Sequence, residues 1–212
     1  MGLAIFTGYL ADMLAKDAEG ASSFKKDLEA VNKHLVKNKQ PKHVEPVKRG
    51  KEKARRHVDS FPYSFLHYLR RAHARVRAGM TLTPVAPNED PADDPTIDDE
   101  GAMLDSHLLC HSDCEGYYVP VDFHEVIFDT SKKPSIPGGM LGSSIRLMSE
   151  LVEVAPAIGI KLDKSGKLSD AAAKRLAAVE EEHDYWRERL VWLALFEAAR
   201  VSIANKCMIV FT

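Results

Sequence analysis

Short apolar segments at the two ends of the chain constrain the fold most strongly. Residues 3–7 near the beginning and 207–211 at the end have the length and apolar character of buried strands, and helical spacing of apolar residues dominates the chain between them. Because a terminal strand often pairs with another central strand, we expect these two segments to be neighbours. The sequence therefore predicts an α+β protein, with several helices packed on a small mixed β-sheet.

Apolar residues at helical spacing mark the expected helices. We expect helices over residues 10–17, over 22–37 with Ser22 or Ser23 as the N-cap, from a Ser60 cap to about Arg77, and up to Pro156 from a cap at Ser143 or Ser144. Apolar positions then recur from Ser169 almost to Asn205. This last pattern predicts one long C-terminal helix, or two helices in line, followed by the terminal strand.

Length, charge and cysteine content narrow the class of protein. A chain of 212 residues suits a single globular domain spanning 1–212, and a net charge of −2 gives no general attraction to nucleic acid or to anionic membranes. Three cysteines are too few for a disulfide framework, which fits a reducing compartment. The first apolar run is too short for a signal peptide or a membrane span. We therefore expect a cytoplasmic protein that does not associate with membranes.

Charged residues are unevenly distributed along the chain. Residues 48–56 are strongly basic, and the helix expected after Ser60 carries Arg70, Arg71, Arg75 and Arg77, which we interpret as its solvated side. Residues 81–100 hold four prolines and seven carboxylates, which indicates an acidic, proline-rich surface loop within the domain. This loop could fold back on the basic segments, or leave them available to a partner.

The stretch from Ser106 to Phe123 is the richest in chemically capable side chains. We expect its SHLLC part to be a buried strand, followed by a polar turn. His111, Asp113 and Glu115 are the candidate catalytic groups there. A zinc site would need His107, Cys110, His111 and Cys114 to converge, and we favour the interpretation that no metal or cofactor is bound, because a strand would point Cys110 away from the histidines.

A carboxylate lies on the apolar side of the long C-terminal helical pattern. Glu197 falls between Leu193 and Val201, so we expect it to be buried. A buried carboxylate needs a partner, for which Arg146, Arg70 and His67 are the candidates. A structural ion pair is the usual outcome, and a catalytic carboxylate is the alternative.

Three segments, HSDCEGYYVPVDF, PGGMLGSS and ERLVWLALFEAAR, resemble an uncharacterised bacterial protein family that is similar in style to toxin-immunity proteins. The resemblance implies a non-enzymatic protein-binding module, an immunity-type inhibitor whose partner is a toxin and not nucleic acid. Tyrosines and carboxylates suit such an interface. The predicted binding residues are Asp113, Glu115, Tyr117, Tyr118 and Asp122. The alternative is a small hydrolase or transferase that uses His111, Asp113 and Glu115.

Overall fold

The computed structural model describes residues 2–55, 60–178 and 181–212, and it confirms the α+β class. The strands are β1 (Gly2–Thr7), β2 (Ser60–Pro62), β3 (Gly116–Val119), β4 (Ile127–Phe128), β5 (Met140–Ser143) and β6 (Ile209–Phe211). The helices are α1 (Tyr9–Lys16), α2 (Ala18–Lys37), α3 (Tyr63–Arg77), α4 (Pro95–Gly101), α5 (Ser144–Val154), α6 (Asp170–Leu176) and α7 (Trp186–Asn205). Short 3-10 turns lie at Pro91–Asp93, Pro137–Gly139 and Ala155–Ile158.

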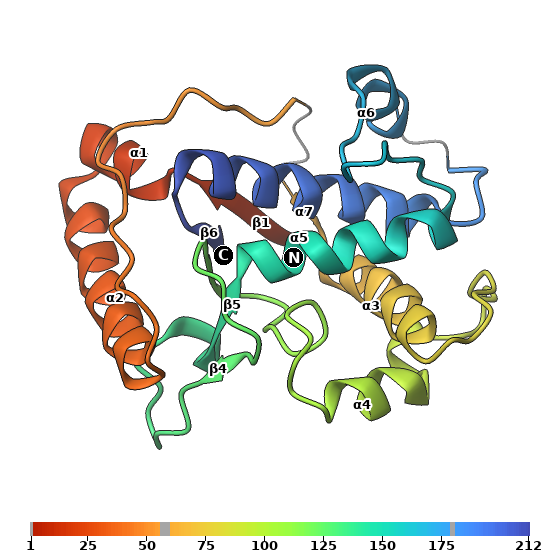
Figure 1. Cartoon of the computed structure of the whole chain (residues 1–212), viewed down its shortest axis with the longest axis horizontal. Coiled ribbons are helices and arrows are strands. Elements are labelled where there is room, and N and C mark those ends of the chain that lie inside the picture. Colours follow the sequence, from red (N-terminus) through yellow and green to blue (C-terminus); the bar gives the residue numbers. More distant parts are fainter. Residues whose placement is uncertain (1, 56–59, 179–180) are drawn as a thin grey trace.

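The strands of the described residues form one mixed sheet in the order β2-β1-β6-β3-β5-β4. The terminal strand β6 lies between β1 and β3 and is antiparallel to both, with Val210 opposite Phe6 on one side and Tyr117 on the other. Strands β3 and β5 run parallel. The predicted pairing of the first and last strands is therefore confirmed, and β1 and β6 lie side by side within the sheet (Figure 1).

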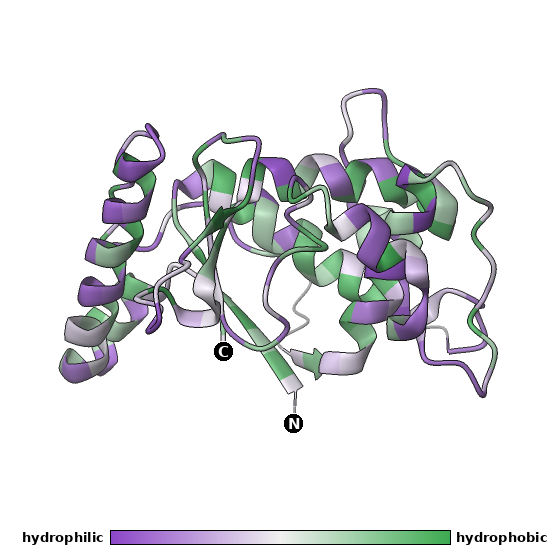
Figure 2. Ribbon diagram, turned by 90° about the horizontal axis from the view of Figure 1, so that it is seen from below, coloured by the Kyte–Doolittle hydropathy of each residue, from purple (hydrophilic) through white to green (hydrophobic). Residues whose placement is uncertain are grey.

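Helices cover both faces of this sheet, so the protein has three layers (Figure 1). Successive residues of a strand point to opposite faces, and the core follows this alternation. Tyr118 and Phe211 pack in the larger apolar cluster with α3, α5 and α7, whereas Tyr117 and Val210 pack in a second cluster with α1 and α2. In Figure 2, α2 lies at the left end and carries both purple and green residues, as expected for a helix with one buried side.

Helix α7 is the central helix of the larger layer. All residues from Val191 to Ala199 are buried, which explains why this part of the sequence is apolar on every side. The Trp192 indole donates a 2.6 Å hydrogen bond to the carbonyl of Leu151 in α5. None of the helices in the described residues is long and apolar enough to cross a membrane.

The structure corrects the predicted C-terminal helix. Helices α6 and α7 are separate elements that do not lie in line (Figure 1), and the expected continuity crosses residues 179 and 180, which lie outside the described residues. Just before α7, the backbone N–H of Tyr185 donates to Nδ1 of His183 at 3.0 Å, so the His183 side chain bonds the backbone ahead of this helix.

The predicted strand at Ser106–Cys110 is wrong as well. These residues form a turn, because the Glu150 carboxylate of α5 accepts 2.7 Å hydrogen bonds from the backbone N–H groups of both His107 and Leu108. Donors bound by one side chain are not available to a strand ladder. The strand of this region lies further along, at Gly116–Val119.

The predicted helix caps are confirmed only in part. Asp17, not Ser22 or Ser23, caps α2 by accepting from the N–H of Gly20. Ser60 lies in β2 instead of capping α3. Ser143 caps α5 by accepting from the N–H of Arg146, as the serine pair before that helix indicated.

Candidate functional site

The charge distribution singles out one part of the chain. Residues 78–131 contain thirteen of the 31 aspartates and glutamates and none of the 29 lysines and arginines. The net charge of the protein is near neutral only because basic residues elsewhere in the chain balance this strongly acidic middle segment. A partner in contact with this segment meets its local field, since charges more than a Debye length of about 8 Å away are largely screened at physiological salt.

The arginines of α3 neutralise the inner carboxylates of this segment. Arg71 and Arg75 both donate to Asp94, at 2.9 and 2.6 Å, and Arg77 donates to Glu100 and Asp105 at 3.0 and 2.9 Å. The prediction that these arginines form a solvated basic side is thus wrong, because Arg70 and Arg71 are each 5% exposed. Of the two arrangements left open for the acidic loop, the structure shows that it folds back on this basic helix.

Asp94 is the main anchor of the inner layer. Its carboxylate accepts from the N–H of Thr96 and so caps α4, while it also receives the two arginines. Burial alone would raise its pKa, but the hydrogen bonds from Thr96 and Arg75 outweigh burial and lower the pKa to about 2. The carboxylate is therefore ionised throughout the physiological range.

The outer carboxylates of the same segment face solvent. We call this group the acidic surface: Glu89, Asp90, Asp93, Asp98 and Asp99, all of them exposed. Within the described residues, no ion pair is found for any of the five. The acidic surface therefore presents unneutralised charge on a scaffold that buried arginines hold from within.

The predicted tyrosine contacts with a partner do not agree with this geometry. Tyr117 and Tyr118 are 5% and 1% exposed, since both belong to β3 in the centre of the sheet. Their hydroxyls donate inward, to Asp27 at 2.8 Å and to the carbonyl of His107 at 2.9 Å. Two of the predicted binding residues are therefore core residues.

The carboxylates of the same predicted set lie closer to the surface. Asp113 is half-buried and bonded to Arg70, and its Oδ2 lies 3.3 Å from Nε2 of His67. Hydrogen bonding from His67, reinforced by Arg70, holds the pKa of Asp113 well below its usual range. Glu115 is exposed and accepts from the N–H of Gly138, and Asp122 is exposed and paired with Arg146.

His111 is the group that a catalytic site would need as its base. Its side chain is buried, and its ring stacks on Tyr118 with 4.1 Å between the ring centroids. Both ring nitrogens lie near backbone carbonyls, those of Ser112 and Tyr117. Burial lowers the pKa of His111 to about 4. The arrangement holds the ring inside the protein and gives it contacts that stabilise the fold.

The four candidate zinc ligands also serve other contacts. Nδ1 of His107 accepts from the N–H of Ser143, and its Nε2 lies 3.0 Å from the carbonyl of His124, so both ring nitrogens are occupied. Cys110 points toward the carbonyl of Gly101, whereas Cys114 is exposed. Across residues 2–55, 60–178 and 181–212, no three or more His, Cys, Asp or Glu side chains are grouped to hold a metal ion.

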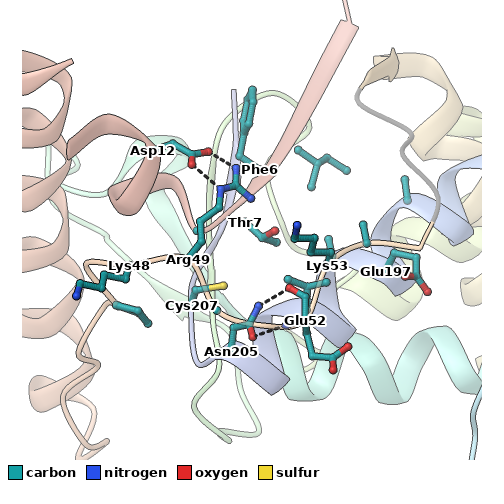
Figure 3. A pocket seen from close by; sticks show the side chains of 18 residues that line it. Phe6, Thr7, Asp12, Lys48, Arg49, Glu52, Lys53, Glu197, Asn205 and Cys207 are labelled. Carbon is teal, nitrogen blue, oxygen red and sulfur yellow. Dashed lines mark hydrogen bonds and ion pairs between the residues drawn. The ribbon is translucent and has the colours of Figure 1, made fainter. Parts of the chain in front are cut away.

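Glu197 lies at the edge of a cavity of about 530 Å³ between the end of β1, residues 46–54 and α7 (Figure 3). It is 1% exposed, as predicted, but its partners are Arg55 at 2.6 Å and Arg200 at 2.9 Å, not Arg146, Arg70 or His67. Figure 3 shows Arg49 bound to Asp12 on the opposite wall of the cavity. Glu197 therefore fastens residues 52–55 to α7 as a structural ion pair.

The fold and the site together define an α+β protein with a polyanionic surface built on a buried layer of arginines. The sequence matches a protein-family model described as "Putative DNA-mimic protein" over residues 1–211, so the chain belongs to this family. Comparisons with curated proteins and with solved structures gave no match.

Family membership corrects the functional predictions made from the sequence. The prediction of an immunity-type inhibitor with a toxin as its partner is wrong, and so is the alternative of a hydrolase or transferase, because the family is described as neither. The five residues of the acidic surface were not among the predicted binding residues. The signal that could have found them is the absence of lysine and arginine over residues 78–131.

Proposed function

We propose that this protein binds a DNA-binding protein through its acidic surface, which takes the place of DNA phosphates. The description of the family supports this proposal. The observation that carries it is the two-layer arrangement of residues 78–131, in which arginines bind the inner carboxylates and the outer ones remain exposed.

DNA-binding proteins offer the chemistry that such a surface would recognise. They contact phosphates with lysine and arginine side chains, and these electrostatic contacts supply much of their affinity for DNA. Outward carboxylates can receive the same cations through charge-assisted hydrogen bonds. Nucleic acid is not the direct partner in this proposal, since a surface of negative charge repels phosphates.

The inner ion pairs contribute by ordering the surface before it meets a partner. The acidic segment is anchored at Asp94, Glu100 and Asp105 by three arginines of one helix. A preorganised surface loses less conformational entropy on binding than a flexible acidic tail does. We propose a cytoplasmic location, where three free thiols would stay reduced and DNA-binding proteins are accessible.

The test is affinity capture from the native host, followed by elution with duplex DNA. We expect wild-type protein to retain one or a few DNA-binding proteins, and duplex DNA to release them, because both ligands would occupy the same basic site. The triple variant D93N/D98N/D99N should lose them. The side-chain carboxylates of these three aspartates accept no hydrogen bond from the described residues, so the substitution removes charge without removing a side-chain contact of the fold.

The matched control is E19Q/E29Q/E153Q, which neutralises three exposed carboxylates outside the acidic segment. It should retain the same proteins as wild type. The proposal fails if the captured proteins resist elution by DNA, or if the two triple variants behave alike.

A further inference from the structure

A second surface stands out at the α2 end of the molecule. Val44 is 82% exposed, the highest value among the large apolar residues described, and Val47 and Val36 are 61% and 51% exposed. All three lie on α2 or on the segment that follows it. Large apolar side chains exposed on one element and the segment after it are candidates for an interaction site.

The exposure of Val44 is imposed by its neighbours. On one side His43 is buried and forms two hydrogen bonds with the Asn32 side chain, of 2.7 and 3.0 Å. On the other side Glu45 is buried, lies 2.6 Å from His43 and accepts from the N–H of Met208 at 2.8 Å. With both neighbours bound inward, Val44 is held outward on an anchored backbone, so its exposure does not reflect a loose loop.

The charge around these valines is positive. Residues 33–48 contain five lysines, and their single carboxylate is that of the buried Glu45. Lys33 and Lys42 are exposed, Lys33 on α2 and Lys42 two residues before Val44. We call this group the Val44 surface: Lys33, Val36, Lys42, Val44 and Val47.

The acidic surface has the complementary composition. Next to it in the chain, just beyond the end of α4, Met103 and Leu104 are 67% and 51% exposed. Leu104 is also anchored, because its carbonyl accepts from the N–H of Val126 and its own N–H donates to Gly101. One end of the molecule thus pairs apolar side chains with lysines, and the other pairs them with aspartates.

The two surfaces cannot meet within one molecule. Helix α2 lies at one end, and α4 lies on the other side of the central sheet (Figure 1). We propose that the Val44 surface binds the acidic surface of a second copy of this chain, in a head-to-tail contact. Such a contact joins two different patches, so it leaves a free patch on each copy and can add further copies.

Head-to-tail association would also regulate the protein, a consequence that rests on the proposed function. The carboxylates that would receive a DNA-binding protein are the same ones that the second copy covers. Self-association and partner binding would therefore compete, and raising the protein concentration at low salt would reduce the capacity for the partner.

Sedimentation velocity of the purified protein tests the contact. We expect wild type to associate in about 50 mM salt and to dissociate in about 500 mM salt, where the Debye length falls to roughly 4 Å. Val44→Asp should weaken self-association by about tenfold or more, as loss of a central apolar contact does in other interfaces. Lys161→Glu is the control, because Lys161 is an exposed lysine outside both surfaces. This variant should associate as wild type does.

Charge reversal gives a sharper result. K33E/K42E and D98K/D99K should each be monomeric alone, and an equimolar mixture of the two should associate again because the reversed surfaces are complementary. The proposal is overturned if wild type is monomeric at low salt, or if the mixture stays monomeric. Failure here is separable from failure of the proposed function, since K33E/K42E leaves the acidic surface intact and should still capture the DNA-binding protein.

Discussion

The guanidinium of Arg71 donates a 2.9 Å hydrogen bond to the carboxylate of Asp94, and both side chains are only 6% exposed. This pair joins α3, which packs in the core, to the start of α4, which carries part of the acidic surface. The pair connects the stability of the fold to the placement of the outer carboxylates. Loss of Asp94 would leave a buried guanidinium without its anionic partner, which is costly.

Asp94→Ala should therefore destabilise the protein by about 3–5 kcal/mol, the range typical when one partner of a buried pair is removed. Loss of the cap on α4 acts in the same direction. The control is Asp93→Ala, and urea unfolding measures the free energy of unfolding of the two variants and of wild type. Asp93 is adjacent and exposed, so its removal should change the free energy of unfolding by no more than about 0.5 kcal/mol. Equal losses in the two variants would contradict this role for Asp94.

A second prediction concerns Glu188 in the first turn of α7. Its side chain is buried, and burial raises its pKa to about 7, an effect that Arg71 and Arg187 offset only in part. Because the folded pKa exceeds the unfolded value of about 4.3, the contribution of Glu188 to stability is fully present below that pH and is lost as pH rises through 7.

Glu188→Gln is uncharged at every pH and removes this dependence. The difference in the free energy of unfolding between the variant and wild type should shift in favour of the variant between pH 5 and pH 8, by up to about 3 kcal/mol. Urea unfolding at the two pH values measures the difference. A difference that is the same at pH 5 and pH 8 would show that Glu188 does not titrate in this range.

The close contact of β3 and β5 gives a third prediction. A Cβ atom on Gly142 would lie 2.3 Å from Cδ1 of the Tyr118 ring, and that tyrosine is 1% exposed and cannot move aside freely. Gly142→Ala should destabilise the fold by about 1–3 kcal/mol, as overpacking of a core does. Gly101→Ala is the control, since a Cβ there meets no atom within 4 Å, and it should be neutral or slightly stabilising. Thermal unfolding compares the two, and a neutral Gly142→Ala would refute the packing described.

The sequence predicted those parts of the fold that depend on local apolar pattern. The spacing of Phe24, Val31 and Leu35 located α2, and the apolar segments at the chain ends identified the two paired strands. The division between α6 and α7 was missed because apolar periodicity continues across it. The turn at His107 and Leu108 was taken for a strand because the Glu150 carboxylate that binds its N–H groups lies about forty residues away in sequence.

The site was missed for a different reason. Groups capable of catalysis, such as His111, stand out in the sequence, whereas the structure buries that ring against Tyr118. The acidity of residues 81–100 was identified from composition, but the segment expected to be a loop contains the helix α4. Its pairing with α3 depends on tertiary contacts such as Arg77 with Glu100, which no local pattern encodes. Only the folded structure separates inner carboxylates from outer ones.

The proposed function requires that the acidic surface occupies the DNA site of its partner. Displacement of a fluorescently labelled duplex from the captured DNA-binding protein measures this directly. We expect wild-type protein to displace the duplex, and D93N/D98N/D99N to need about tenfold or more higher concentration, since each lost charge-assisted contact costs on the order of 1 kcal/mol. E19Q/E29Q/E153Q should match wild type. A duplex that stays bound at saturating wild-type protein would contradict the central claim.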